Sequence, residues 1–258
     1  MNVMVMAGTK DAANIIKKLS STQKFSILAT TTTSYGADIA KTAGADKVIS
    51  KGLTLEELIE VIKTNDINIL VDATHPFAAN ATYNAINSSK ITGITYLRFE
   101  RPLEDFKEND LIHEVSSFEE AALKAGKITK GRVLHLAGVS TLKPIIDKID
   151  SSRLFARVLP SVNSIQKCID IGIKQENIIA MQGVFSKEFN KTLFEEYGIS
   201  LIITKESGQT GGTLSKINAA IELGIDVILV TRPKVAELKN KDIFTDLDEI
   251  INFMLKNR

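Results

Sequence analysis

Ile69-Leu70-Val71-Asp72-Ala73-Thr74-His75-Pro76-Phe77-Ala78 is the stretch that decides the fold class of this chain. A short apolar run ends at Asp72, a polar turn follows, and a helical pattern then continues. A strand that leads into a helix presents unpaired backbone N–H groups and the positive end of the helix dipole, and Pro76 suits the first helical position. Ligands of open α/β sheets bind beyond the carboxyl ends of strands, so Asp72, Thr74 and His75 are candidate site residues. The alternative is a well-capped turn with a hydrogen-bonded histidine.

The alternation of strand and helix patterns extends to both sides of this segment. Expected strands are 2–6, 25–33, 46–49, 69–72, 94–99, 111–115, 132–136, 154–159, 177–181, 200–204 and 226–230. Helical patterns lie between them, and a last amphipathic helix is expected over 244–255. The sequence therefore predicts an α/β protein with two doubly wound Rossmann-like domains, mainly parallel sheets and an inter-domain cleft. We expect an N-terminal domain over 1–101 and a C-terminal domain over 102–258, joined by the polar run 104–110.

Composition excludes several functional classes. The 258 residues are 44% hydrophobic and 24% charged, with a net charge of +1 and no basic or acidic block, so neither nucleic acid nor an anionic membrane is an expected partner. The chain shows no signal-peptide pattern and no apolar run of membrane-spanning length. Cys168 is the only cysteine, which excludes an intrachain disulfide and favours a reducing cytoplasm. The three histidines lack metal-ligand spacing, so no metal site is expected.

A glycine turn follows the first expected strand. Gly8 and Thr9 stand between that strand and a helix pattern, an arrangement that favours a phosphate or pyrophosphate. It is not the three-glycine dinucleotide fingerprint. Thr32 and Ser34 end the second strand, where they could contact a ribose or simply favour strand formation. Neither an acid nor an arginine stands there, so we expect modest discrimination between NADH and NADPH, leaning to NADH.

A second glycine-rich loop connects the strand 200–204 to the next helix. It contains Ser207, Gly208, Gly211 and Gly212, and Lys216 follows on the first helical turn. Backbone amides in such a loop can surround an anion while the lysine neutralises it. The loop lacks the Gly-Lys-Ser/Thr ending of nucleotide triphosphatases, which disfavours ATP hydrolysis. A flexible connector is the alternative interpretation.

Arginine placement suggests how an anionic ligand is bound. Among only seven arginines, five fall on or beside predicted strands: Arg98, Arg101, Arg153, Arg157 and Arg232. Arginine binds carboxylates and phosphates through two parallel hydrogen bonds. We assign Arg98, Arg101, Arg157 and Arg232 to substrate carboxylates. The structural alternative is that these arginines pair with acids such as Glu100 or Asp105.

Taken together, these motifs resemble the precorrin-6A reductase family of vitamin B12 biosynthesis. The resemblance covers nearly the whole chain and rests on the following segments: Gly8-Thr9, 72–78, 96–102, 181–186, Ser207-Gly208 with Gly211-Gly212, Lys216 and 231–233. The segments 72–78 and 97–102 are specific, whereas the glycine turns are not. Ser34-Tyr35-Gly36 resembles the anaerobic, cobalt-containing branch. Ala7 and Asp11 depart from the usual glycine and glutamate of the first turn.

The resemblance implies reduction of one carbon–carbon double bond of cobalt-precorrin-6A, a tetrapyrrole with many acetate and propionate groups, by NADH or NADPH. The implied cofactor-binding residues are Gly8, Thr9, Thr32, Ser34, Asp72, Thr74, Ser207, Gly208, Gly211, Gly212 and Lys216. Hydride addition also needs a proton at the neighbouring carbon, and His75 is the candidate donor or substrate-positioning residue. Two alternatives remain open: a different two-domain NAD(P)-dependent reductase, and a non-catalytic module that binds a nucleotide or tetrapyrrole.

Overall fold

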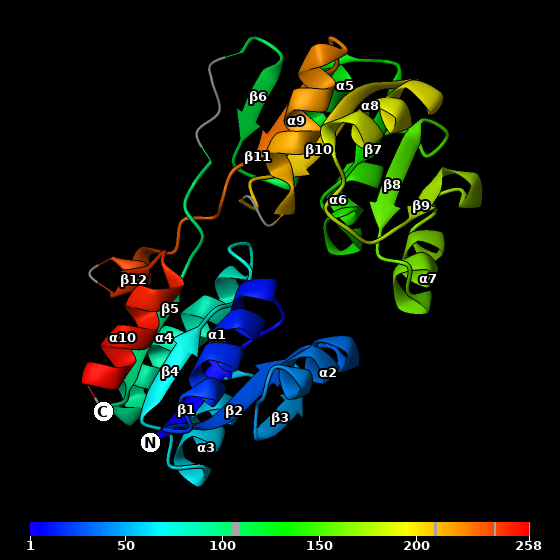
Figure 1. Cartoon of the computed structure of the whole chain (residues 1–258). Coiled ribbons are helices and arrows are strands. Elements are labelled where there is room, and N and C mark those ends of the chain that lie inside the picture. Colours follow the sequence, from blue (N-terminus) through cyan, green and yellow to red (C-terminus); the bar gives the residue numbers. More distant parts are fainter. Residues whose placement is uncertain (105–108, 209–210, 240, 258) are drawn as a thin grey trace. The chain divides into compact units, whose positions relative to one another are not determined.

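The computed structural model describes residues 1–104, 109–208, 211–239 and 241–257 and divides into two compact units. Unit 1 comprises Met1–Pro102 with Pro233–Arg258, and unit 2 comprises Leu103–Arg232. Within the described residues, each unit contains one six-stranded sheet in which every neighbouring pair is parallel, with helices packed against it (Figure 1). The predicted fold class, two Rossmann-like α/β domains with parallel sheets, is confirmed.

The strands of the two sheets have the following bounds. Unit 1 contains β1 (Asn2–Met6), β2 (Ser26–Thr31), β3 (Lys47–Ser50), β4 (Ile69–Asp72), β5 (Thr95–Phe99) and β12 (Ile243–Phe244). Unit 2 contains β6 (Ile112–Val115), β7 (Arg132–His135), β8 (Leu154–Val158), β9 (Ile178–Ala180), β10 (Ile199–Lys205) and β11 (Asp226–Val230).

The helices alternate with these strands. Those of unit 1 are α1 (Lys10–Ser21), α2 (Ser34–Thr42), α3 (Leu55–Thr64), α4 (Ala79–Thr92), α10 (Leu247–Lys256) and the 3₁₀ helix η4 (Ala236–Leu238). Those of unit 2 are α5 (Phe118–Ile128), α6 (Lys143–Ile146), α7 (Val162–Asp170), α8 (Lys187–Glu196), α9 (Thr213–Glu222) and the 3₁₀ helices η1 (Val139–Thr141) and η2 (Gln175–Asn177).

The central strand β1 shows why its residues form a doubly covered strand. Val3 and Val5 pack with α1 and α10 on one face, whereas Met4 and Met6 pack with α3 and α4 on the other. Successive side chains of a strand point to opposite faces, so a continuous apolar run fills both cores. The uninterrupted hydrophobicity of this strand is therefore a consequence of its central place in the sheet.

The strand order shows an exchange of edge strands between the two sheets. Sheet A has the order β12-β5-β4-β1-β2-β3, and sheet B has the order β6-β11-β10-β7-β8-β9. Both follow the doubly wound order in which the sixth strand lies beside the fifth. The sixth position of sheet A is taken by the last strand of the chain, and β6, which follows β5 in sequence, takes the sixth position of sheet B. The expected C-terminal domain over 102–258 is therefore wrong for the last part of the chain, because Pro233–Arg258 belongs to unit 1.

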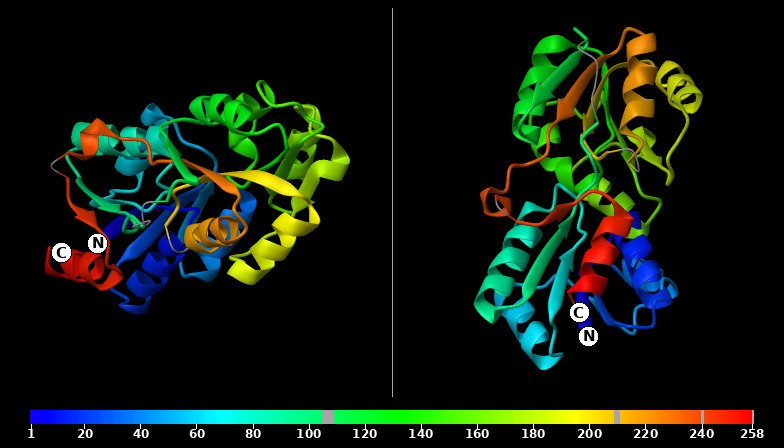
Figure 2. Two further views of the ribbon diagram at one scale, coloured as in Figure 1. Left: turned by 90° about the horizontal axis from the view of Figure 1, so that it is seen from above. Right: turned by 60° about the vertical axis from the view of Figure 1, so that its left-hand side comes forward.

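The C-terminal segment also differs in detail from the expected helix over 244–255. Ile243–Phe244 pairs with β5, and α10 begins only at Leu247 because Asp246 caps it by accepting the N–H groups of Asp248 and Glu249. The red helix α10 lies beside the blue helix α1 (Figure 2). Its buried side chains complete the same core cluster as those of α1.

The segment after β4 differs from the expectation as well. Pro76 lies in a turn, and α4 begins three residues later at Ala79. Ala78 precedes the helix without any side-chain capping bond. The loop between β4 and α4 is therefore longer than predicted, and it contains Thr74, His75 and Phe77. Among the described residues, no helix is both long and apolar enough to cross a bilayer.

The placement of α10 predicts that unit 1 depends on the end of the chain. Ile250 is fully buried in the core cluster, so Ile250→Ala should lower the free energy of unfolding by about 2–5 kcal/mol. Hydrogen exchange of the β1 and β4 amides, followed by mass spectrometry, measures this loss. Ile91→Ala on α4 is the matched control, since Ile91 is 60% exposed and should change stability by less than about 0.5 kcal/mol. Equal exchange in the two variants would contradict the packing.

Candidate active site

The first candidate site lies at the switch point of sheet A, where β1 and β4 are neighbours and the chain winds away in opposite directions. Met6 and Asp72 are partners in the register, so the segments that follow the two strands begin at the same level. The Thr9 hydroxyl donates to the carbonyl of Ala73 at 2.8 Å and accepts the N–H of Ala12 at 3.1 Å. The Gly8 turn and the 72–78 segment, which the sequence predicted separately, thus meet through Thr9.

The Gly8 turn fits a dinucleotide phosphate. Gly8 has φ +110°, a conformation that favours glycine, and a Cβ placed there would have no atom within 4 Å. The backbone approach to the N-terminus of α1 is therefore open, and the helix dipole favours an anion there. Thr32 and Ser34 are exposed directly after β2, the strand beside β1, which is a suitable place for ribose contacts.

Asp72 is at the centre of a buried hydrogen-bond network. Its Oδ1 accepts the N–H and hydroxyl of Thr74 at 3.1 and 2.6 Å and pairs with the Arg98 guanidinium at 2.8 Å. Its Oδ2 accepts the hydroxyl of Tyr96 at 3.0 Å. Arg98 also donates to the Thr74 hydroxyl at 3.1 Å and pairs with Glu100 at 3.5 Å. Burial, followed by the charge of Asp72, raises the pKa of Tyr96, so the phenol remains a donor.

This network changes the interpretation of two predicted ligand contacts. Asp72 is 0% exposed and Arg98 is 1% exposed, and their charged atoms bind each other. The geometry favours a positioning role over direct contact with cofactor or substrate, because any ligand atom would have to displace a buried ion pair. Tyr96 was not recognised in the sequence, although its spacing of two from Arg98 places both side chains on one face of β5.

His75 lies in the loop that this network holds. Its Nδ1 accepts the N–H of Phe77 at 3.1 Å, and the two rings contact each other with centroids 5.8 Å apart. An Nδ1 that accepts a backbone N–H leaves the proton of the neutral ring on Nε2. His75 is partly exposed.

Two further predicted arginines are paired with acids of their own unit. Arg101 binds Asp11 in the first turn of α1, and both side chains are largely buried. In unit 2, Arg232 pairs with Glu206, whose side chain is 6% exposed. Of the two acids named in the sequence analysis, Glu100 pairs with Arg98, and Asp105 lies outside the described residues. These pairs favour the structural alternative for Arg101 and Arg232, and their assignment to substrate stays a prediction.

The second candidate site lies at the switch point of sheet B, after β7 and β10. In the described part of the glycine-rich loop after β10, Ser207 and Thr213 bond through their hydroxyls at 3.0 Å, and Gly211 N–H donates to the carbonyl of Gly208 at 2.9 Å. A Cβ on Gly211 would lie 2.0 Å from the Ser207 hydroxyl oxygen. Gly212 has φ +64°, the left-handed conformation that lets α9 begin directly after it. These contacts hold the described part of the loop, and the binding of an anion by this loop stays a prediction.

Three cations gather beside this loop. Arg157 is the next-to-last residue of β8, Lys205 ends β10, and Lys216 lies on the first turn of α9 with 4% exposure. Arg157 stacks on the Phe185 ring at 5.3 Å and donates to the Asn190 side chain at 3.2 Å. Burial, with the charges of Arg157 and Lys205, lowers the pKa of Lys216 to about 7. Burial also lowers the pKa of Arg157 to about 10 and that of Lys205. Lys205 was not recognised in the sequence.

Exposed apolar side chains also follow or precede the elements at this end of sheet B. Leu159 follows β8 and is 53% exposed, Val162 begins α7, Val184 precedes α8, and Leu214 is the second residue of α9. Val184 lies against the Gly212 backbone, 3.0 Å from where a Cβ would be. A cationic cluster with exposed apolar side chains at the same end of the sheet suits a large apolar ligand that carries carboxylates.

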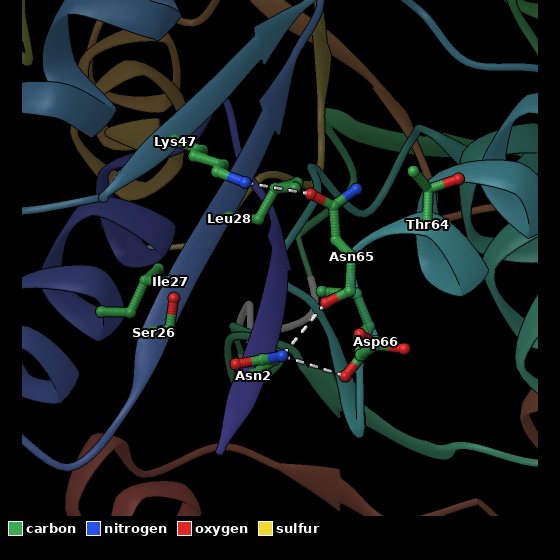
Figure 3. Close-up of a pocket in the computed structure, with 9 residues that line it drawn as sticks. Asn2, Ser26, Ile27, Leu28, Lys47, Thr64, Asn65 and Asp66 are labelled. Carbon is green, nitrogen blue, oxygen red and sulfur yellow. Dashed lines mark hydrogen bonds between the residues drawn. The ribbon is translucent and has the colours of Figure 1, made fainter.

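Other polar features of the molecule lie away from these two edges. Figure 3 shows a pocket at the amino ends of β1, β2 and β3, where Asn2 donates to the carbonyls of Asn65 and Asp66 at 3.1 and 3.2 Å. Its polar walls bond to each other, and ligands of α/β sheets bind at the opposite, carboxyl ends. The described residues contain no group of three or more His, Cys, Asp or Glu side chains placed to hold a metal ion.

The Asp72 network generates a prediction about stability. Arg98→Met leaves the Asp72 carboxylate buried without its cation and should cost about 3–5 kcal/mol of unfolding free energy. Urea unfolding measures the loss. Arg132→Met is the matched control, because the exposed Arg132 donates to the carbonyl of Tyr197 and its loss should cost only about 1 kcal/mol. Unchanged stability of Arg98→Met with weakened substrate binding would restore Arg98 as a ligand residue.

His135 generates a prediction about pH. Its Nε2 lies 2.9 Å from the hydroxyl of Thr141 in the loop after β7, while its buried Nδ1 has no hydrogen-bond partner among the described residues. Burial lowers the pKa of His135 to about 3. The unfolded chain therefore binds an extra proton below about pH 6.5, and stability should fall from that pH downwards by up to about 1.4 kcal/mol per pH unit. His135→Gln should flatten this slope in urea titrations between pH 4 and 7, and an unchanged slope would contradict a neutral, buried imidazole.

Comparisons with known proteins agree with this architecture. The model of the family described as precorrin-6x reductase CbiJ/CobK matches residues 2–255. A cobalt-precorrin-6A reductase of Methanothermobacter thermautotrophicus is 45% identical over 99% of this chain and 84% of its own length. One of Methanocaldococcus jannaschii is 44% identical over 98% of each chain. A solved structure of CobK precorrin-6A reductase, at 22% identity, covers 99% of this chain and 97% of its own with a TM-score of 0.80, and it supports the fold. The chain therefore belongs to the precorrin-6x reductase CbiJ/CobK family of oxidoreductases.

Proposed function

We propose that this chain reduces one carbon–carbon double bond of cobalt-precorrin-6A, with NADH or NADPH as the hydride donor, to give cobalt-precorrin-6B. The observation that carries the proposal is that the carboxyl ends of the strands carry different chemical groups in the two sheets. One sheet offers backbone N–H groups and hydroxyls around Gly8 and Thr9, and the other offers the cations Arg157, Lys205 and Lys216 together with exposed apolar side chains at the same end of sheet B. The relatives named as cobalt-precorrin-6A reductases supply the substrate.

Unit 1 is the proposed nicotinamide site. The pyrophosphate would bind at the Gly8 turn and the N-terminus of α1, with Thr32 and Ser34 beside the adenosine ribose. A bound nicotinamide supplies hydride chemistry, and the protein orients it. The Asp72 network fixes the loop that carries His75, which supports a role for His75 beside the bound ligands. Asp72 and Thr74 thus serve the cofactor through the backbone they hold.

Unit 2 is the proposed macrocycle site. Its three cations are close enough to lower the pKa of Lys216, so an anionic ligand that neutralises them would relieve this repulsion. Acetate and propionate groups meet that requirement, and the exposed apolar side chains suit the ring itself. Lys216 and the 207–212 loop, expected from the sequence to bind the cofactor, are therefore assigned to the macrocycle. A module that binds a nucleotide alone would have no use for this buried cationic cluster.

The test is anaerobic incubation with cobalt-precorrin-6A and each nicotinamide in turn, followed by mass measurement. A product heavier by two hydrogens, formed with oxidation of the nicotinamide, is expected. The absence of an acid or arginine after β2 favours NADH. Lys51 follows β3 and pairs with Glu57, and the adjacent Gly52 lies beside Thr32, so Lys51 is the cation to replace if NADPH is strongly preferred. Binding of both ligands without reduction would support the non-catalytic alternative.

Gly8→Asp tests the cofactor site separately. A carboxylate at the N-terminus of α1 would repel the pyrophosphate, so nicotinamide affinity should fall by about a hundredfold or more. Isothermal calorimetry measures the affinity, and circular dichroism monitors the fold. Gly93→Asp is the matched control: Gly93 also has a positive φ and open space around its Cβ position, but it ends α4 at the other edge of the sheet. Equal nicotinamide affinity of the two variants would show that the Gly8 turn is not part of the cofactor site.

A further inference from the structure

We propose that Lys216 is the proton donor of the reduction, delivering its ammonium proton to the carbon next to the one that receives hydride. This inference rests on the proposed function and deepens it. Lys216 comes from α9, directly after the glycine-rich loop, and its side chain lies among groups from β8 and β10 at the carboxyl edge of sheet B. It is therefore placed within the macrocycle site and not on an exposed helix face.

The surroundings of Lys216 set it apart from a lysine that only supplies charge. No hydrogen bond or ion pair joins its ammonium to the described residues, although it is 4% exposed. The charged groups that face it are Arg157 on β8, Lys205 on β10 and Glu104 after β5. Lys187 and Lys191 on the adjacent α8 pair with Glu222 at the far end of α9. A buried ammonium next to two cations loses its proton more readily than an ordinary lysine.

A general acid works best when its pKa lies near the working pH, and that of Lys216 is lowered to about 7 by burial first and by its cationic neighbours second. Substrate binding should also favour protonation of Lys216. Carboxylates bound to Arg157 and Lys205 would neutralise the two charges that oppose protonation, so the pKa of Lys216 should rise when the macrocycle binds. The same ligand would then bring both the double bond and the proton to the site.

The chemistry balances in one step. A hydride, with two electrons, leaves the dihydronicotinamide and forms a C–H bond at one carbon of the double bond, and the π bond breaks. The electron pair of the π bond takes the proton of Lys216 at the other carbon, and the N–H bond breaks. The nicotinamide is oxidised, the macrocycle is reduced by two hydrogens, and the neutral amine of Lys216 regains a proton from water.

The deciding variant is Lys216→Arg, which keeps the positive charge but holds its proton too tightly to give it up near neutral pH. A stable polycarboxylate porphyrin such as uroporphyrin serves as the binding probe, and calorimetry in buffers of different ionisation enthalpy counts the protons taken up. We expect Lys216→Arg to bind the probe within about threefold of the unmodified chain, to lose the proton uptake at pH 8, and to lower kcat by about 10²- to 10⁴-fold. Glu104→Gln shows whether that carboxyl contributes to the uptake, and Lys191→Arg is the control for the substitution itself.

The pH dependence supplies a second readout. With saturating substrate, kcat of the unmodified chain should decrease at alkaline pH as a single group loses its proton. This alkaline limb of the pH profile should be absent in Lys216→Arg. A kcat of Lys216→Arg within tenfold, or a persisting alkaline limb, would overturn the proposal. Loss of the limb in His75→Gln instead would make His75 the donor.

Folding and function can be separated from this test. If Lys216→Arg fails to fold, NMR titration of the reductively ¹³C-methylated lysines of the unmodified chain, assigned with Lys216→Met, gives the pKa directly. A value within one unit of 10.5 in the free protein would overturn the proposal. If the unmodified chain reduces no cobalt-precorrin-6A, the proposed function fails, whereas the titration and the proton uptake still report on Lys216.

Discussion

The carboxylate of Asp72 is the constraint on which the candidate site of unit 1 depends. It takes the hydroxyl and N–H of Thr74, the phenol of Tyr96 and the guanidinium of Arg98 in a place without solvent. A buried charge is tolerated only when nearly all of its acceptor capacity is used. The segment after β4 therefore has little freedom, and the Thr9 hydroxyl on Ala73 ties the start of α1 to the same point. The position of the Gly8 turn follows from this arrangement.

The two units use the same topology for opposite electrostatic tasks. At the switch point of sheet A, the buried Arg98 pairs with Asp72 and Glu100, and the proposed ligand contact is the N-terminus of α1. At the switch point of sheet B, Arg157 and Lys205 lie near the buried Lys216, with Glu104 as the acid that faces it, while Glu206 pairs with Arg232. Burying like charges together costs stability, which supports the proposal that an anion binds at this site. The proposed dinucleotide site in unit 1 and the proposed macrocycle site in unit 2 therefore differ in charge.

The sequence predicted the alternation of elements well because central strands such as β1 and β4 are buried on both faces, and helices such as α1 and α3 show an apolar stripe. The two glycine turns were also predicted, because a backbone with positive φ favours glycine and a glycine is visible in the sequence. The end of the chain was misjudged because β12 is only two residues long, and nothing local tells which sheet it joins. A domain boundary set by composition could not anticipate that β6 and β12 exchange sheets.

Arg98 and Lys216 show why the candidate site was harder to predict than the fold. An arginine at a strand end has the same sequence signature whether it faces a ligand or a buried acid. The register of β4 with β5, in which Asp72 and Arg98 are partners, decides between these roles. Lys216 was found by its place after a glycine-rich loop, but its lowered pKa comes first from burial and then from the charge of Arg157, which is 59 positions away in the sequence and is brought near by β8. Local sequence specifies which groups are present, and the parallel register specifies which charges they face, so the chemistry of both edges follows from strand order.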